Sequence, residues 1–159
     1  TPNQERTNCD HPSALDFDVL EKVLKELQSS GTTSVPNYDF ATHNRVGHED
    51  FDAAPIIIVE GILALWNSSI RDMLDLKVYV DAPSDVRLQR RMERDQQERG
   101  RDADSIQRQW NDTVQPMHDR YVEPSRGYAD QIIDGTANLK NAAADFWTHG
   151  SIPTNPEAR

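Results

Sequence analysis

Residues 76–101 read LKVYVDAPSDVRLQRRMERDQQERGR, and this stretch decides the fold class. Its first part, 76–83, is rich in apolar and β-branched side chains and predicts a strand. A helix is expected directly afterwards. Ser84 is a residue type that caps helices, Asp85 favours the positive helix end, and Gly100 provides a stop. A strand that passes at once into a helix is the repeating unit of α/β proteins.

The flanking sequence continues this alternation of strands and helices. Apolar residues recur at helical spacing between residues 20 and 27, so we expect a helix over 13–28 that stops at Gly31. The continuously apolar run AAPIIIVEG, residues 53–61, predicts a buried parallel strand. The other expected elements are extended segments and loops over 34–52, helices over 68–74, 104–121 (kinked or divided by Pro116) and 138–147, and a strand over 129–134. The prediction is therefore an α/β fold with a parallel sheet.

The overall composition excludes several classes of function. A formal net charge of −10 over 159 residues argues against general nucleic-acid binding, which needs a broadly basic surface. The chain contains no apolar run long enough to predict a membrane span. Cys9 is the only cysteine, so no internal disulfide can form, and a reducing cytoplasmic location is expected.

Six arginines between residues 87 and 101 oppose this acidic balance. Four of them share one helix face, where like charges repel and an anionic partner would offset the cost: Arg87, Arg90, Arg91 and Arg94. Guanidinium groups bind phosphate oxygens through paired hydrogen bonds, and α/β sheets bind ligands beyond the carboxyl ends of their strands. The sequence therefore favours phosphate binding.

The alternative is a solvated helix face covered by ion pairs, which is the usual state of a charge run. Three acids lie in the same window. Glu98 stands four residues after Arg94, whereas Glu93 and Asp95 are expected to lie off the arginine face.

Five stretches together resemble the phosphoribulokinase/uridine kinase family, and within it the uridine–cytidine kinases. They are NCDHPSALDFDVL, VPNYDFATHNR, IIIVEGILAL, VYVDAPSDVRLQRRMERDQQERGRD and EPSRGYADQII. The resemblance as a whole extends over about residues 5–138, and the stretches follow one another in the order and spacing of the family. The resemblance implies a P-loop kinase-like parallel sheet flanked by helices. It also implies a partial kinase-like domain over 1–149 and a loose C-terminal tail over 150–159.

The resemblance assigns a role to individual residues. Those implied to bind the nucleoside are Asp10, Tyr38, Phe40, His43, Arg91, Arg101 and Gln109. Arg94 and Arg99 would face the transferred phosphate, and Glu60 would help to place Mg²⁺. The implied reaction transfers the γ-phosphoryl group of ATP (or GTP) to the 5′-hydroxyl of uridine or cytidine, in cytoplasmic pyrimidine salvage. Family members commonly form homotetramers.

Taken singly, several of these residues have simpler explanations. An acid beside proline, such as Asp10, also serves as a cap at the start of a helix. Aromatic side chains such as Tyr38 most often fill a core, and a lone histidine such as His43 is most often a surface residue. Glu60 ends an apolar run, where an exposed acid costs little.

The main departure from the family concerns its phosphate-binding loop, Gly-x-x-x-x-Gly-Lys-Ser/Thr. No lysine follows a glycine anywhere in the 159 residues, and only nine residues precede Asp10. The family carries this loop and its catalytic-base aspartate upstream of the DHP stretch. We therefore expect an incomplete fold without the P-loop strand and first helix, exposed edges on the strands predicted at 56–60 and 78–81, and a chain that is inactive alone.

The sequence is compatible with three functions, and it does not decide whether the chain is an enzyme. The first is a uridine/cytidine kinase fragment. The second is a non-catalytic nucleoside-binding or regulatory subunit. The third is an arginine-rich interaction protein, which would bind unrelated polyanions equally and lose them at modest salt.

Overall fold

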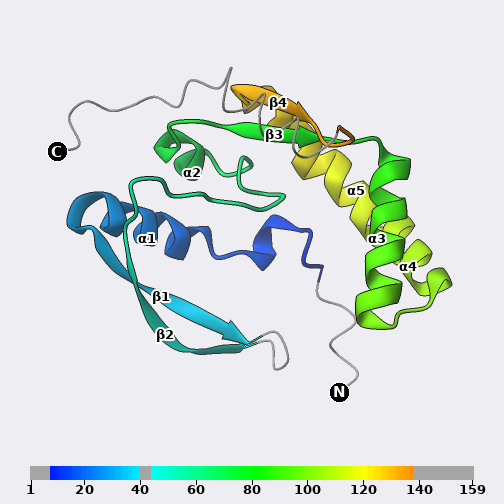
Figure 1. Cartoon of the computed structure of the whole chain (residues 1–159), viewed down its shortest axis with the longest axis horizontal. Helices are drawn as coiled ribbons and strands as arrows, with labels where there is room; N and C mark the ends of the chain where they lie inside the picture. The colour runs from blue at the N-terminus through cyan, green and yellow to red at the C-terminus, as the bar shows by residue number, and fades with distance from the viewer. Residues whose placement is uncertain (1–7, 40–43, 138–159) are drawn as a thin grey trace.

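The computed structural model describes residues 8–39 and 44–137. It confirms a mixed α/β fold, with an antiparallel pair β1–β2 and a parallel pair β3–β4 (Figure 1). The elements are η2 Pro12–Ala14, α1 Phe17–Ser30, β1 Thr32–Asp39, β2 Asn44–Asp52, α2 Ser68–Met73, β3 Val78–Asp81, α3 Ser84–Arg99, α4 Ala103–Gln109, η3 Trp110–Val114, α5 Gln115–Met117, η4 His118–Val122, η5 Glu123–Tyr128 and β4 Gln131–Asp134. The helix expected at 138–147 lies outside the described residues. Within the described ranges, no helix is long and apolar enough to cross a membrane.

The N-terminal helix starts later than the sequence predicted. Its first turn begins at Phe17, because the side chain of Asp16 accepts the backbone N–H of Val19 and caps the helix there. The preceding Pro12–Ala14 segment forms a short 3₁₀ turn. The predicted stop is confirmed: Gly31 has φ 75°, a left-handed conformation that glycine adopts without strain.

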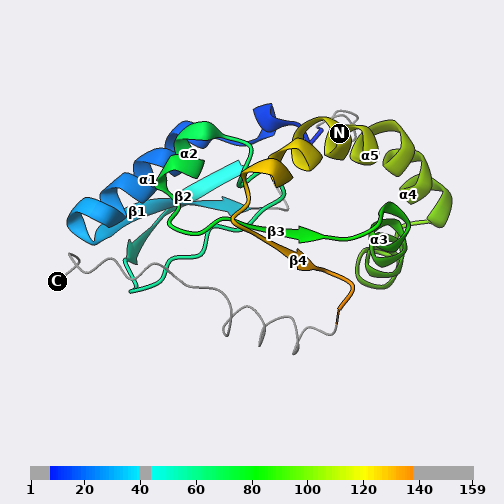
Figure 2. The same cartoon turned by 90° about the horizontal axis from the view of Figure 1, so that it is seen from above.

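The parallel pair positions the arginine helix. β3 runs beside β4 with Val78 opposite Gln131, and α3 leaves the carboxyl end of β3 (Figure 2). α3 ends at Gly100, as predicted, in a left-handed conformation with φ 61°. The prediction that Ser84 caps the helix is wrong. Its hydroxyl donates to Gln115 Oε1 at 2.8 Å and so joins α3 to α5.

The helix predicted over 104–121 is a continuous but irregular helical segment that extends from α4 to η5. Two π-helical turns, η3 and η4, flank the short α5 that contains Pro116. Proline has no N–H to donate and its ring crowds the preceding turn, so a regular α-helix cannot run through this position. The expectation that Pro116 would kink or divide the helix is met only as a change of helix type, because the segment is helical without a break from residue 103 to residue 128.

The buried strand predicted over 53–61 is not formed. This segment is irregular, and Ile56, Ile57 and Ile58 are exposed. A parallel strand needs hydrogen-bonding neighbours, and in the described part of the chain the parallel sheet contains only β3 and β4. Without a neighbouring strand, the apolar run has no ladder to join.

The described core lies between three parts of the chain. They are the turn that follows residues 53–61, strand β3, and the irregular helical segment that extends from α4 to η5. Leu63, Tyr79 and Val122 form its centre. The phenol of Tyr79 donates to Glu123 Oε2 at 3.1 Å. Burial, together with the neighbouring Glu123 carboxylate, raises the pKa of Tyr79 to about 12, so the phenol stays protonated and keeps this hydrogen bond.

A substitution at Ile58 tests this correction. Ile58 is 84% exposed, so Ile58→Asn is expected to change the free energy of unfolding by less than about 0.5 kcal/mol. Ile70 is fully buried, and the comparison variant Ile70→Ala should cost about 2–5 kcal/mol. Urea unfolding followed by circular dichroism measures both. A loss above about 2 kcal/mol for Ile58→Asn would support the buried strand instead.

Candidate functional site

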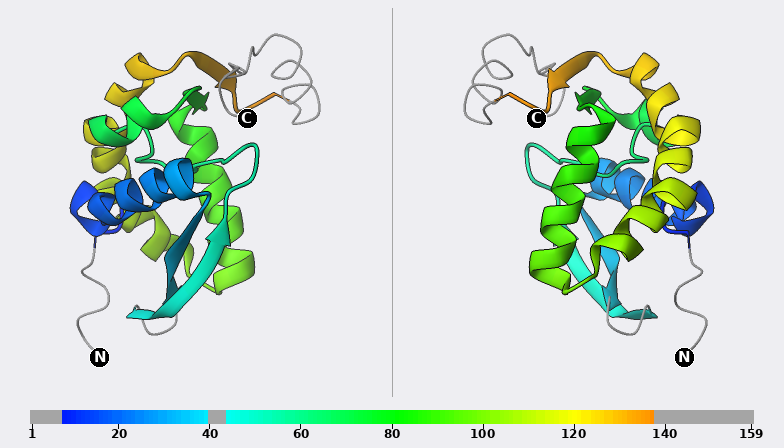
Figure 3. Two further views of the ribbon diagram at one scale, coloured as in Figure 1. Left: turned by 90° about the vertical axis from the view of Figure 1, so that its left-hand side faces the viewer. Right: turned by 90° about the vertical axis from the view of Figure 1, so that its right-hand side faces the viewer.

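The arginine helix α3 packs beside α4 (Figure 3). The turn at Gly100 brings Arg101 back toward α3, where its backbone N–H donates to the backbone oxygen of Asp95 at 3.1 Å. Asp95 lies in this junction and is fully buried. Four guanidinium groups surround its carboxylate, with N–O distances of 2.8 Å from Arg94, 3.2 Å from Arg101, 3.3 Å from Arg99 and 3.6 Å from Arg91. All four arginines are residues to which the sequence assigned a site role. The structure therefore brings the predicted arginines together around one buried acid.

Asp95 itself was missed by the sequence reasoning, and the expectation that it lies off the arginine face is wrong. It stands four residues after Arg91 and four before Arg99, which is the spacing of neighbours on a helix surface. The sequence alone therefore contained the spacing that could have identified Asp95 as a neighbour of these arginines. The partner expected for Arg94 was Glu98, but Arg94 turns to Asp95, with hydrogen bonds from Nε at 3.0 Å and Nη2 at 2.8 Å.

Gln109 joins the nucleoside-assigned residues to this cluster. Its Oε1 atom accepts Arg101 Nη1 at 2.8 Å and Arg91 Nη2 at 3.0 Å. Arg101 also donates to Ser105 Oγ at 3.3 Å. Arg91, Arg101 and Gln109, which the resemblance placed in one binding site, therefore form one hydrogen-bonded group.

The electrostatics keep Asp95 ionised. Burial alone raises the pKa of its carboxyl group, but the hydrogen bond and charge of Arg94, together with the charges of Arg91 and Arg99, outweigh this effect. The pKa of Asp95 therefore lies below its ordinary value of 3.8. One carboxylate neutralises only one of the four guanidinium charges, so the cluster keeps an excess of positive charge suited to a phosphate group.

Asp10 acts on the same cluster. Desolvation lowers the pKa of Arg91, and the negative charges of Asp95 and, to a smaller extent, Asp10 oppose that shift. The alternative role of Asp10 as a helix cap is not borne out. The caps at this point of the chain are His11, which accepts the backbone N–H of Ser13, and Asp16.

The DHP stretch is also tied to the late helical segment. His11 Nε2 and the hydroxyl group of Tyr121 share a hydrogen bond of 3.0 Å, and their rings make an edge-to-face contact at 5.1 Å. This contact joins residues 110 positions apart and fixes the place of Asp10 relative to the helices.

Not every arginine of the predicted face belongs to the site. The guanidinium of Arg87 donates to the backbone oxygen of Ala82 at 3.1 Å and to Gln115 Oε1 at 3.3 Å, and it lies over the ring of Trp110. These contacts fasten the start of α3 to the later helical segment. Arg87 is therefore a structural residue.

The hairpin carries the base-binding residues of the prediction. Tyr38 lies in β1, opposite Arg45 of β2, next to a register shift that begins at Pro36. Phe40 and His43 lie outside the described residues. Their roles, and that of Tyr38, stay predictions.

The predicted magnesium residue does not form a metal site with the described part of the chain. Glu60 is exposed and lies in the irregular segment that follows β2. Among residues 8–39 and 44–137, no three histidine, cysteine, aspartate or glutamate side chains are grouped so that they could hold a metal ion. Mg²⁺ is commonly held by only one or two carboxylates together with substrate phosphates, so the role of Glu60 stays a prediction.

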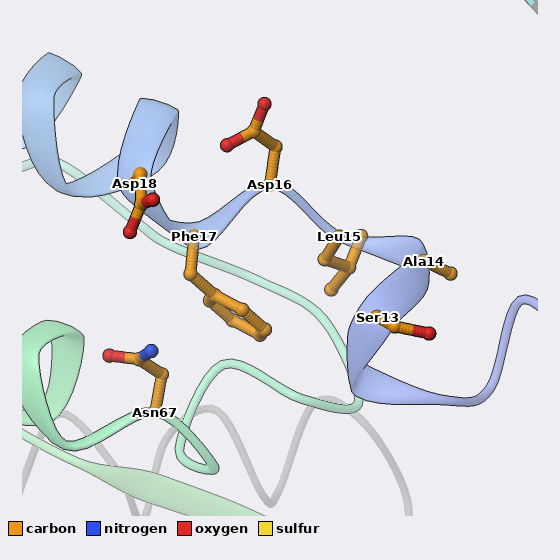
Figure 4. A pocket seen from close by; sticks show the side chains of 7 residues that line it. All are labelled: Ser13, Ala14, Leu15, Asp16, Phe17, Asp18 and Asn67. Atoms are coloured by element: carbon orange, nitrogen blue, oxygen red, sulfur yellow. The ribbon is translucent and has the colours of Figure 1, made fainter.

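Two hollows formed by the described residues lie away from the arginine cluster. One of about 480 Å³ lies between the start of α1 and the start of α2, with Phe17 and Asn67 among its lining residues (Figure 4). Another of about 370 Å³ is lined by residues that include Trp66 and Tyr128. Neither is lined by a predicted site residue. The arginine cluster, not a cavity, is therefore the candidate functional site.

Comparison with known proteins connects this geometry to a family. The profile of the Phosphoribulokinase / Uridine kinase family matches residues 2–141. Curated relatives include proteins named uridine kinase from Staphylococcus aureus strains JH9, Newman and Mu50. Each is 48% identical over 144 residues, which cover 89% of this chain and 69% of the relative.

Proposed function

Because the chain belongs to the phosphoribulokinase/uridine kinase family, we propose that it serves the ATP-dependent phosphorylation of the 5′-hydroxyl group of uridine or cytidine. Within this reaction it supplies the nucleoside site and the arginines that face the transferred phosphate. The fold proposed for the domain is the P-loop kinase-like sheet of the family, incomplete in this chain, over residues 1–149 with a tail over 150–159. The family-based expectations of a homotetramer and of a cytoplasmic location are kept as part of the proposal.

The arginine cluster around Asp95 is the observation that supports this function most strongly. Phosphoryl transfer is catalysed mainly by positioning and by neutralising charge on the transferred group. The uncompensated positive charge of the cluster provides that neutralisation. We assign Arg94 and Arg99, whose side chains are about half exposed, to the transferred phosphate.

The more deeply held residues are assigned to the nucleoside. Arg91, Arg101 and Gln109 form one hydrogen-bonded group. Asp10, which acts on Arg91, would accept hydrogen bonds from the ribose hydroxyl groups. The base would bind against Tyr38, Phe40 and His43.

The donor is proposed to be ATP (or GTP) with Mg²⁺, as the family implies. A phosphate-binding loop of the Gly-x-x-x-x-Gly-Lys-Ser/Thr type does not occur in the 159 residues, and Glu60 alone makes no metal site. For this chain by itself we therefore propose nucleoside binding without phosphoryl transfer. The second candidate, a non-catalytic nucleoside-binding or regulatory subunit, is favoured by the same sequence observation.

Calorimetric titration of uridine into the 159-residue chain tests the proposal. Saturable binding at one site is expected, and Arg101→Ala should weaken it by about tenfold or more, because a charged hydrogen-bond donor is lost. The matched control is Arg108→Ala, which removes the same charge from the exposed end of α4 and should leave the affinity unchanged.

Two results would contradict the proposal. The first is no binding heat in a sample that circular dichroism shows to be folded. The second is equal binding of unrelated polyanions that disappears at modest salt, which would indicate an arginine-rich interaction protein. UMP formation on addition of ATP and Mg²⁺ to this chain alone would overturn the restriction to binding.

A further inference from the structure

Asp95 is the only buried charged residue among those that the structure describes. Burial of a carboxylate is costly unless opposite charges and hydrogen bonds compensate it. Here the compensation comes entirely from arginines to which site roles are assigned. Asp95 therefore contacts all four arginines of the cluster and can influence all of them together.

The two carboxylate oxygens of Asp95 divide the four arginines into pairs. Oδ1 contacts Arg94 and Arg99, the pair assigned to the phosphate. Oδ2 contacts Arg91 and Arg101, the pair assigned to the nucleoside. Each carboxylate oxygen therefore contacts two arginines that share one assigned role. The roles were assigned from the sequence resemblance, and the contacts were found independently in the structure.

The two pairs also differ in how firmly they are held. The side chains of Arg91 and Arg101 are 19% and 29% exposed, and Gln109 accepts a hydrogen bond from each. The side chains of Arg94 and Arg99 are 45% and 56% exposed. The phosphate-assigned pair is therefore the more accessible to an incoming ligand.

We propose that Asp95 is a positioning residue that couples nucleoside binding to phosphate binding. The inference rests on the proposed function and deepens it. A phosphate group competes with Oδ1 for Arg94 and Arg99. When these two arginines turn to the phosphate, the charge of Asp95 acts on fewer guanidinium groups and holds Arg91 and Arg101 more firmly in the nucleoside-binding arrangement.

This exchange makes each ligand favour the other. Because coupling between two binding sites is reciprocal, phosphate raises the affinity for nucleoside by the same factor by which nucleoside raises the affinity for phosphate. A carboxylate that served only to stabilise the fold would contribute to stability and would leave the two affinities independent.

The test is a calorimetric cycle on the 159-residue chain, with uridine and inorganic pyrophosphate as the two ligands. Saturating pyrophosphate is expected to tighten uridine binding by at least about fivefold. In Asp95→Asn the same factor should be close to one. Glu98→Gln, the same change at an exposed position of α3, should keep the wild-type factor, and Asp95→Glu should recover part of it. A wild-type factor of one, or an unchanged factor in Asp95→Asn, would overturn the proposal.

A second measurement on the wild-type chain covers the case in which Asp95→Asn does not fold. NMR signals of the arginine Nε–Hε groups are followed while pyrophosphate is added without uridine. The signals of Arg94 and Arg99 are expected to shift directly, and those of Arg91 and Arg101 to shift with them through Asp95. Shifts confined to Arg94 and Arg99 would refute the coupling. Absence of uridine binding would refute the proposed function, whereas the arginine signals would still show whether Asp95 links the two arginine pairs, because this measurement needs no nucleoside.

Discussion

Arg94→Ala is expected to lower kcat by about a thousandfold while changing KM for uridine by less than about threefold. The effect is that of removing a catalytic arginine from a phosphoryl-transfer site, for which losses of about 10³–10⁵ are typical. Arg94 approaches Asp95 through two nitrogen atoms and remains 45% exposed, so its guanidinium can turn to an incoming phosphate. At saturating nucleotide Arg94 is assigned to the phosphate and not to Asp95, and it does not contact Gln109, so KM for uridine should change little.

The measurement needs a chimera that supplies a Gly-x-x-x-x-Gly-Lys-Ser/Thr loop and its strand to this chain. Steady-state kinetics with uridine then separate kcat from KM. Arg90→Ala is the matched control, because Arg90 is an exposed arginine of the same helix that makes no contact with Asp95. A loss confined to KM, or an equal loss in the control, would remove Arg94 from the catalytic step.

Local signals in the sequence were sufficient for much of this fold. The ends of α1 and α3 follow from Gly31 and Gly100, which adopt the left-handed conformation that a helix stop requires. Pro116 sits where the long helical segment changes to π-helical turns. These features depend on residues close to one another in the chain, and a single sequence shows them directly.

Features that depend on distant partners could not be predicted in the same way. The apolar run at 53–61 has the composition of a buried strand, but a strand forms only beside another strand, and that partner is not specified by the run itself. Ser84 has the composition of a cap, yet its hydroxyl binds Gln115, which lies 31 residues later. In both cases the tertiary environment overrides the local preference.

The candidate site shows the same division. The four arginines were identified from the sequence and its resemblance to a family, and the structure places them around one point. Asp95, the residue at the centre of the arginines, was missed. A helical projection shows the direction of a side chain, but it does not show which other parts of the chain pack against that side chain. α4 and the turn at Gly100 bury Asp95 by returning Arg101 to α3, and this return is visible only in the structure.

Asp95→Asn is expected to lower the free energy of unfolding by about 2–3 kcal/mol at pH 7. Removing one member of a fully buried ion pair typically costs about 3–5 kcal/mol, because the remaining charge is left without compensation. Arg94 and Arg99 are about half exposed and can turn to water, which reduces that cost. Arg91 and Arg101 are more buried, and they retain most of the penalty. Urea unfolding measures the difference, and Glu98→Gln should change stability by less than about 0.5 kcal/mol.

The dependence of this difference on pH separates the charge of Asp95 from its shape. Since the pKa of Asp95 is lower in the folded chain than its ordinary value of 3.8, the folded state binds the proton less readily than the unfolded state. The stabilisation by the carboxylate is therefore fully present above about pH 4 and is lost as the pH falls through the folded pKa. The stability gap between the wild type and Asp95→Asn should begin to shrink as the pH falls below 3.8, and it should close below the folded pKa, where a protonated Asp95 resembles asparagine. A gap that stays constant as the pH falls would mean that packing, rather than charge, makes Asp95 important.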